Sequence, residues 1–331
     1  MAFYSNHDAN SRAHWAGANA SVDVHNEMLE ALIEHGVRQN SQFTQNKWTQ
    51  VKYTEGNTNT IGHRMIGGTT TGVRQYGELL EPKRIVNEKV IMKVDRAVYT
   101  QVQTDFFDDW TAPSFSVEYA AEAGHAQAKE YDTLHMRMLI KAPSWAPPAS
   151  LTTRFPVGQA TNMNGYNALS TREAKAKMIA DQHSEAILRL TKNDIDRSGL
   201  ITLVSPDIYH VLSSYWDGQN ALWQATGAVN DAARRKLVHL NGIPVYETNL
   251  FPTGAVASSP MGSQFNLSAD EARGQIVIFD PRKVLITPTA KELYGFTETF
   301  PSQLHTLMTT IRMFNVGHKN GGSVQVLRPA A

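Results

Sequence analysis

The chain has 331 residues, and its 31 lysines and arginines balance 31 aspartates and glutamates, so the formal net charge is zero. A protein that binds nucleic acid through its phosphates has an excess of basic over acidic residues, and this chain has none. The absence of cysteine excludes disulfides, thiolate metal sites and cysteine nucleophiles. Apolar residues make up 41% of the chain, which excludes wholesale disorder, and the length suits two domains or one domain with an insertion.

The N-terminal part of the chain predicts an arm over residues 1–47. Residues 1–26 are rich in Asn, Ser, Ala and His without a hydrophobic period, and we interpret them as flexible or draped. They contain no apolar core of a signal peptide, and no window approaches the roughly 18 apolar residues of a membrane span. Asn26 to Val37 has the spacing of a short helix, with Gly36 as its expected C-cap.

Residues 48–95 predict an extended, two-stranded loop. Apolar and polar residues alternate from Trp48 onward and again from Val86 to Val94, which is the period of a strand. Gly67 to Gly72 has the glycine spacing of a phosphate loop, but Val73-Arg74 follows where Lys and Ser or Thr are needed, so a hairpin tip is the preferred interpretation. A glycine-rich ribbon without a hydrophobic face of its own is marginal in water, and we expect another copy of the chain to support it.

One long helix is predicted after this loop. Val98 to Phe106 continues as a strand or extended segment, and Pro113-Ser114 marks a helix start, because proline is tolerated in the first turn. Apolar and small residues then recur at spacings of three and four in a single stripe: Val117, Ala120, Gly124, Gln127, Tyr131, Leu134 and Met138. Prolines from Pro143 onward end this helix and mark a domain boundary.

The second domain alternates helices and strands. Ser170 and Glu173 have the spacing of a capping box for a helix reaching about Leu190, with Ala176, Ile179, Ala186 and Leu190 facing inward. Leu200 to Val204 predicts a buried strand, and Ser205-Pro206-Asp207 caps the next helix. Asn241-Gly242 is the strongest hairpin signal. Further strands are expected over 275–279, 283–287, 306–316 and 323–327.

Recognisable catalytic patterns are missing from the sequence. There is no His-Glu-x-x-His pair and no Gly-x-Ser-x-Gly elbow, so no cofactor, metal site or catalytic residue is predicted. His183 is interpreted as a satisfied core histidine, and the basic run Arg234-Arg235-Lys236 as a solvated helix face. A catalytic site of dispersed residues leaves no spacing signature, so an enzyme stays open as an alternative.

Three stretches resemble the major capsid proteins of tailed bacteriophages with the Hong Kong 97-type fold, and especially the podophage branch. The first is Ser205-Pro206-Asp207-Ile208-Tyr209, similar to that family's strand-to-helix turn. The second runs from Leu237 to Gly254 and resembles its hairpin and following loop. The third is Gly317-His318 with Gly321-Gly322 and Leu327-Arg328-Pro329. The order of elements over residues 27–328 matches as well.

The resemblance implies an α+β fold with a loop over residues 48–95, a peripheral domain over 96–148 and 299–331, a spine helix over 114–141 and an axial domain over 149–298. It implies a structural protein, not an enzyme, that self-assembles into hexamers and pentamers of an icosahedral head enclosing double-stranded DNA. The implied partners are other copies, a separate scaffolding protein, the portal protein and, by non-specific proximity, the packaged DNA, with no membrane.

The implied location is the virion capsid, assembled in the host bacterial cytoplasm. Candidate contact residues between subunits are Arg64, Arg74, Glu78, Lys83, Arg84, Val90 and Met92. A tail or connector ring protein is the alternative among virion components.

Overall fold

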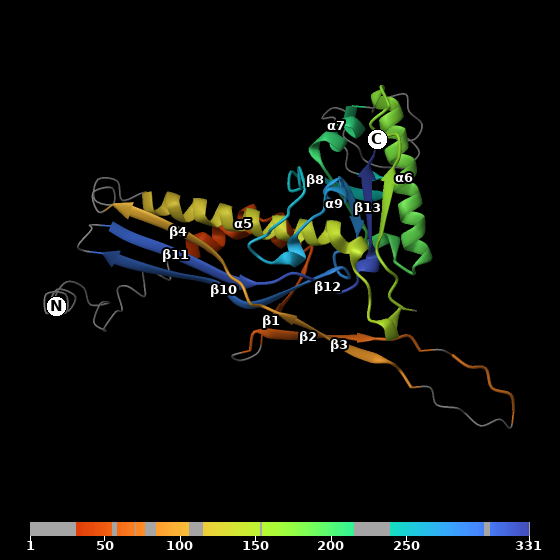
Figure 1. Ribbon diagram of the computed structural model, residues 1–331, viewed down its shortest axis with the longest axis horizontal. Coiled ribbons are helices and arrows are strands. Elements are labelled where there is room, and N and C mark those ends of the chain that lie inside the picture. Colours follow the sequence, from red (N-terminus) through yellow and green to blue (C-terminus); the bar gives the residue numbers. More distant parts are fainter. Residues whose placement is uncertain are drawn as a thin grey trace. The chain divides into compact units, whose positions relative to one another are not determined.

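The computed structural model describes residues 31–54, 58–69, 71–76, 84–105, 115–152, 154–214, 239–300 and 305–330. The chain divides into two compact units (Figure 1): the first comprises Met1–Asn46, Val94–Asp132 and Thr289–Asn315, and the second comprises Lys47–Lys93, Thr133–Pro288 and Val316–Ala331. Several predictions lie outside the described residues: the arm over 1–26, Glu78, Lys83, the helix start at Pro113-Ser114, and Arg234-Arg235-Lys236.

The first unit is an antiparallel sheet covered on one face by helices. Strand β11 (His305–Phe314) lies between β10 (Leu285–Phe300) and β4 (Val98–Asp105), and its register pairs Thr310 with both Gly295 and Thr100. Helix α5 (Phe115–Lys141) runs along these strands in Figure 1. A small core joins the helices to the sheet: Ile33, Val37, Ala120, Ala123 and Ala128, with Leu293 and Met308 packed against them.

The helix near the N-terminus does not end where the sequence predicted. It continues to residue 40, and the short helix α3 (Gln42–Gln45) follows after Ser41. Gly36 is therefore inside the helix and not its C-cap. It lies against Gly124 of α5, where an added Cβ on Gly124 would meet the Ile33 carbonyl oxygen at 2.8 Å. Glycine is therefore required at position 124, whereas an added Cβ on Gly36 would meet its nearest atoms at 3.5 Å, an ordinary contact distance.

The predicted stripe of α5 is confirmed, and burial of the helix extends beyond that stripe. Ala120, Gly124, Gln127, Tyr131, Leu134 and Met138 are all buried, whereas the side chain of Val117 is outside the described residues. From Tyr131 onward the helix is buried on almost every side, including the polar residues Asp132 and His135. A 3-10 helix, Ala142–Ser144, ends it at the predicted proline.

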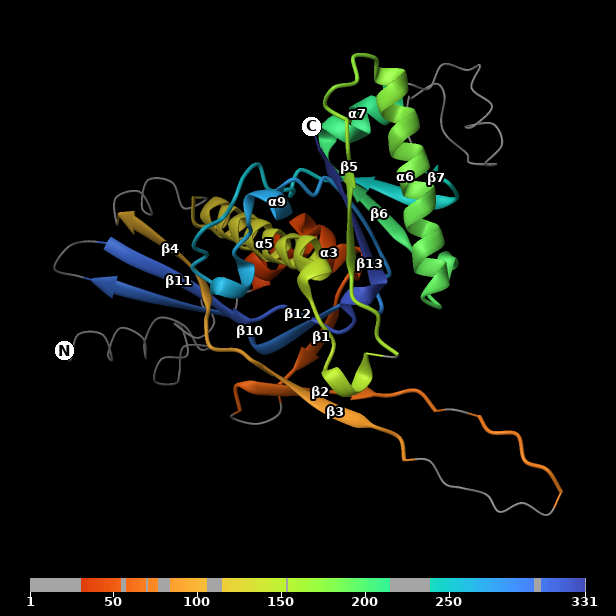
Figure 2. The same cartoon turned by 45° about the vertical axis from the view of Figure 1, so that its right-hand side comes forward.

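The second unit contains a six-stranded sheet with the order β5-β13-β9-β6-β8-β7. These strands are β5 (Gln159–Met163), β13 (Val324–Pro329), β9 (Ile276–Phe279), β6 (Ile201–Val204), β8 (Ile243–Glu247) and β7 (His239–Leu240). In both views of the ribbon, α6 (Arg172–Lys192) runs beside this sheet (Figures 1 and 2).

The last strand is placed differently from the prediction. Residues 299–331 were expected to return together to the peripheral domain, but β13 pairs in parallel with β5 and antiparallel with β9. The reason is burial, since every residue from Val324 to Arg328 is buried, as an interior strand of this sheet requires. Only β11 and the end of β10 from this range belong to the sheet of the first unit.

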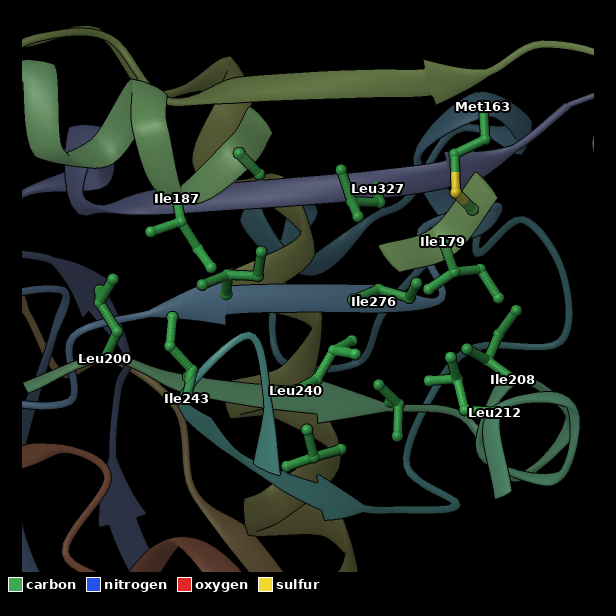
Figure 3. Close-up of a cluster of buried hydrophobic side chains, with 14 of the residues drawn as sticks. Met163, Ile179, Ile187, Leu200, Ile208, Leu212, Leu240, Ile243, Ile276 and Leu327 are labelled. Atoms are coloured by element: carbon green, nitrogen blue, oxygen red, sulfur yellow. The ribbon is translucent and has the colours of Figure 1, made fainter. Parts of the chain in front are cut away.

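The core of the second unit lies between the sheet and its helices. Ile179, Ile187 and Leu190 of α6 pack with Ile276 and Leu327 of the sheet, and Ile208 and Leu212 of α7 (Pro206–Ser214) complete one end (Figure 3). The four predicted inward residues of α6 are all buried. Its N-cap is Thr171, whose side chain accepts from the Ala174 N–H, and not Ser170 as the capping-box spacing suggested.

The predicted hairpin at Asn241-Gly242 is confirmed. Both residues have positive φ, 50° and 77°, between β7 and β8. Glycine adopts this region without a steric cost and asparagine tolerates it better than most residues. The remaining short elements are β1 (Gln50–Tyr53), α9 (Ala269–Ala272), β12 (Gly317–His318) and 3-10 helices over Ala149–Leu151, Arg197–Gly199, Ser263–Phe265 and Gly321–Ser323.

Candidate subunit-contact surface

The predicted two-stranded loop is a hairpin of β2 (Thr60–Ile66) and β3 (Asn87–Lys93). The antiparallel ladder runs from Thr60 opposite Lys93 to Ile66 opposite Asn87. Because side chains alternate along a strand, the hairpin has two faces with different surroundings. We call the face of Ile61, His63, Met65, Glu88, Val90 and Met92 the inner face, and the face of Arg64, Ile66, Lys89 and Ile91 the outer face.

The inner face packs against its own unit. Ile61 and Met65 are buried, and an added Cβ on Gly317 would meet the Met92 sulfur at 2.7 Å. At the other end of the hairpin, the Ser150 hydroxyl donates to the Glu88 carboxylate. The expectation that the ribbon lacks a hydrophobic face of its own is therefore wrong for the strands.

Two of the predicted contact residues, Val90 and Met92, lie on this inner face. Both are half-buried, and Met92 contacts Gly317 of the same chain. Their predicted contact with a neighbouring subunit stays a prediction, since they already pack on their own unit.

The outer face is exposed and combines apolar and basic side chains. Ile91 is 60% exposed and Ile66 is 51% exposed, although both are large aliphatic residues. Arg64 and Lys89 are exposed on the same face. Large exposed apolar side chains that share a surface with cations are typical of protein contact sites. Arg64 was predicted from the sequence as a contact residue, whereas Ile66 and Ile91 were not.

The loop beyond the strands is the most exposed part of the hairpin. Gly67 N–H donates to the Val86 carbonyl at 2.7 Å, and no ladder continues past this point among the described residues. Val73 and Tyr76 are fully exposed, and Arg74 and Arg84 are exposed as well. Figure 2 shows the described residues of this loop projecting away from β2 and β3.

Exposed apolar residues concentrate in this part of the chain. Of the 16 large hydrophobic residues that are exposed in the described chain, 8 lie between residues 51 and 91: Val51, Tyr53, Ile66, Val73, Tyr76, Ile85, Val86 and Ile91. A soluble monomer leaves such residues scattered. Six of the eight lie on the hairpin and its loop and two on β1, and this concentration indicates a surface that another protein covers.

The buried histidine of the second unit has a structural role, as predicted. His183 bonds through Nε2 to the Thr202 hydroxyl at 2.9 Å and through Nδ1 to the Asn241 amide at 3.2 Å. Burial is the main reason that its pKa falls to about 3, with a smaller contribution from Arg197. Within the described residues, no three His, Asp or Glu side chains are grouped in a way that could hold a metal ion. The described helices also include none with the length and apolarity to span a membrane.

Comparison with known proteins connects this architecture to phage capsids. A profile of the Gp10A-like family, described as major capsid protein, matches residues 75–277. No curated protein matches the chain.

Among solved structures, a chain of the bacteriophage PhiM1 mature capsid is similar at 28% identity, with a TM-score of 0.76 and coverage of 97% of both chains. The cyanophage P-SCSP1u capsid is similar at 14% identity, with a TM-score of 0.72 and coverage of 86% of each chain. A virus-like particle from Pyrococcus furiosus is similar at 13% identity, with a TM-score of 0.55, over 92% of this chain and 99% of that chain.

These likenesses confirm the α+β, Hong Kong 97-type fold that the sequence predicted. They also place the chain among structural components of a bacteriophage virion capsid. Since the family profile covers more than half of the chain, the chain belongs to the Gp10A-like family of major capsid proteins.

Proposed function

We propose that many copies of this chain assemble into the hexamers and pentamers of an icosahedral phage head that encloses double-stranded DNA. The observation that carries the proposal is the likeness to the PhiM1 mature capsid chain over 97% of both chains. A likeness of this extent includes most of the hairpin as well as the cores of the two units.

The hairpin is the proposed arm that reaches an adjacent copy. Ile66, Ile91 and the apolar residues of the loop supply area, while Arg64, Arg74, Glu78, Lys83 and Arg84 pair with charges of the neighbour. A single exposed ion pair contributes only about 0–1 kcal/mol to the free energy of association. Most of that free energy therefore comes from burial of apolar area, summed over many contacts. Contacts that are weak individually also allow misplaced subunits to leave during assembly.

Val90 and Met92 take part in a different way from the one first expected. They face the unit from which the hairpin extends, and Met92 contacts Gly317 there. They thereby fix the hairpin in place, so that its outer face and loop are presented to the neighbour. A rigidly held contact segment loses less conformational entropy on binding.

The proposed domain roles follow the family resemblance. Residues 96–148 together with β11 form the peripheral domain around the spine helix, and residues 149–298 form the axial domain around the five-fold and six-fold axes. In this proposal the axial domain also includes β13, because β13 pairs with β5 and β9.

The proposed partners and location also follow that resemblance. The partners are a separate scaffolding protein, the portal protein and the enclosed DNA, with assembly in the host bacterial cytoplasm. The proposed role is structural and not enzymatic.

The test is electron microscopy of the full chain, expressed alone and with candidate scaffolding proteins. The proposal predicts closed shells built of pentamers and hexamers. A single ring of fixed copy number would identify a tail or connector component instead. A small oligomer whose enzyme activity depends on one polar residue would favour the dispersed-site alternative.

A further inference from the structure

A group of basic side chains lies near the root of the hairpin, by which we mean the end where Thr60 pairs with Lys93, away from the loop. Lys52 comes from β1, His63 from the inner face of β2, and Lys319 follows β12. The Lys52 ammonium donates to the Gly62 carbonyl at 3.1 Å, beside His63. The Lys319 ammonium donates to Gln50 Oε1 at 2.9 Å, two residues before Lys52. Three separate segments thus bring two ammonium groups and an imidazole to the same end of the hairpin.

The two ammonium groups are oriented by neutral oxygens. Among the described residues, the Lys319 ammonium donates to the Arg282 carbonyl at 3.4 Å as well as to Gln50, and the Lys52 ammonium donates to the Gly62 carbonyl. Within the described residues, no carboxylate lies within 4.0 Å of either ammonium. Strand β3, which pairs with β2, carries one acid, Glu88, and its carboxylate accepts from the Ser150 hydroxyl.

The positive charges of Lys319 and Lys52 affect the protonation of His63. Its pKa is lowered from the ordinary value, mainly by partial burial and then by the charges of Lys319 and Lys52. A neutral imidazole retains a ring N–H that can donate to an anion, and a negative charge bound nearby favours its protonation.

We propose that Lys52, His63 and Lys319 form a binding site for an oxyanion, either a phosphate or a carboxylate. Both ligands present acceptor oxygens to several N–H donors at once, which the two ammonium groups and the imidazole supply. Binding offsets the repulsion between the two ammonium groups and ties β1, β2 and the segment after β12 together. The site thereby fastens the root of the hairpin to the unit from which it extends.

Two sources can supply the oxyanion: free phosphate, or a carboxylate side chain of a second copy of the chain. Only the second source rests on the proposed shell assembly. The first can be measured on the unassembled subunit, so a failure of the site and a failure of the assembly proposal are separable.

The first experiment measures the pKa of His63 by NMR of the full-length, unassembled chain with labelled histidine, and His63→Gln assigns the signal. Inorganic phosphate should raise the His63 pKa by about one unit relative to chloride at equal ionic strength. The rise should disappear in Lys52→Met and Lys319→Met. Lys177→Met, an exposed lysine of α6, should retain it. No phosphate-dependent rise, or the same rise in all three lysine variants, would overturn phosphate as the ligand.

The second experiment repeats the measurement on assembled particles in phosphate-free buffer. A raised His63 pKa in particles, lost in Lys319→Met particles, identifies a carboxylate of a neighbouring copy. If neither phosphate nor assembly moves the His63 pKa, the oxyanion site is refuted, whether or not shells form.

Discussion

The Ser41 hydroxyl donates a 2.6 Å hydrogen bond to Asp132 Oδ1, although 91 residues separate the two in sequence. The same carboxylate accepts from the backbone N–H groups of Gln42 and Phe43, at 2.7 and 3.4 Å. Asp132 thus binds the first turn of α3, where backbone N–H groups have no partner within the helix. A residue in the middle of α5 thereby fixes the segment that leads from the N-terminal helix toward the hairpin.

The first prediction concerns how Asp132 makes stability depend on pH. Burial raises the pKa of this carboxyl to about 6, against the opposing effects of its hydrogen bonds and of Arg312. Because the folded pKa lies above the unfolded value of 3.8, this group favours the folded state most below that value, and the contribution is lost as the pH rises through about 6. Between about pH 4 and pH 7.5, the free energy of unfolding of the wild type should fall relative to Asp132→Asn by on the order of 3 kcal/mol.

Urea unfolding of both proteins across this pH range measures the difference. Asp181→Asn, at an exposed position of α6, serves as the control and should follow the wild type. Parallel pH profiles for wild type and Asp132→Asn would show that burial of this carboxyl has no net effect on stability.

His183 should produce a pH dependence of the opposite sign. Its folded pKa of about 3 lies below the ordinary 6.5, so the neutral ring contributes stability that is complete above 6.5 and decreases as the pH falls. From about pH 7 to pH 4.5, the wild type should lose about 2–3 kcal/mol relative to His183→Gln, whose amide can still bond Thr202.

Thermal or urea unfolding at these two pH values tests the difference. His210→Gln, an exposed histidine of α7, should leave the acid sensitivity of the wild type unchanged. Equal acid sensitivity in the wild type and His183→Gln would contradict the buried neutral state.

The close helix crossing at Gly124 predicts that even the methyl group of Gly124→Ala lowers the folding stability. In an unconstrained helix, glycine to alanine stabilises by up to about 1 kcal/mol. Here the added Cβ of Gly124→Ala meets the Ile33 carbonyl oxygen at 2.8 Å and the Gly36 Cα at 3.2 Å, both backbone atoms. The variant should therefore be destabilised by about 1–3 kcal/mol in denaturant unfolding.

Ala126→Ser, on the exposed side of α5, should change the unfolding free energy by less than about 0.7 kcal/mol. A Gly124→Ala protein as stable as the wild type would show that the two helices can separate without cost.

The local elements were predictable where one short segment determines its own conformation. Asn241-Gly242 could be assigned because both residues suit positive φ, and α5 because its stripe repeats over many turns. The burial of Asp132 and His135 in the second half of α5 could not be predicted, because both look like exposed polar positions until Ser41 and Thr287 are brought to them. The predicted N-cap of α6 was one residue too early, because Ser170 and Thr171 are adjacent and either hydroxyl suits an N-cap.

Pairings between elements that are distant in sequence were harder to predict than the elements themselves. The sequence of β13 predicts a strand, but nothing local says that it pairs with β5 and β9. For the contact surface, Val90, Ile91 and Met92 are consecutive apolar residues, so either face of β3 could be the buried one. The tertiary structure decides this: Met92 packs against Gly317 on the inner face, which leaves Ile91 on the exposed face.

Ile91 gives the sharpest single-residue test of the outer face. Since its side chain is 60% exposed, Ile91→Glu should change the unfolding free energy by no more than about 0.5 kcal/mol. In the proposed shell the glutamate is buried against a neighbour, where an unpaired charge is costly, so the yield of particles should drop at least tenfold. Ile91→Val, which retains an apolar side chain, should assemble normally. Sedimentation of the assembly reaction measures both.

The measurement that bears most directly on the central proposal removes the exposed loop and retains the hairpin. Replacing residues 69–84 with Asn-Gly leaves the ladder through Ile66 and Asn87 and the 2.7 Å bond from Gly67 to Val86 intact, and supplies a favoured two-residue turn. Negative-stain microscopy of this variant with the scaffolding protein that supports wild-type assembly should show a folded subunit and no closed shells. Closed shells at the wild-type yield would contradict the proposal that this loop joins one copy of the chain to the next.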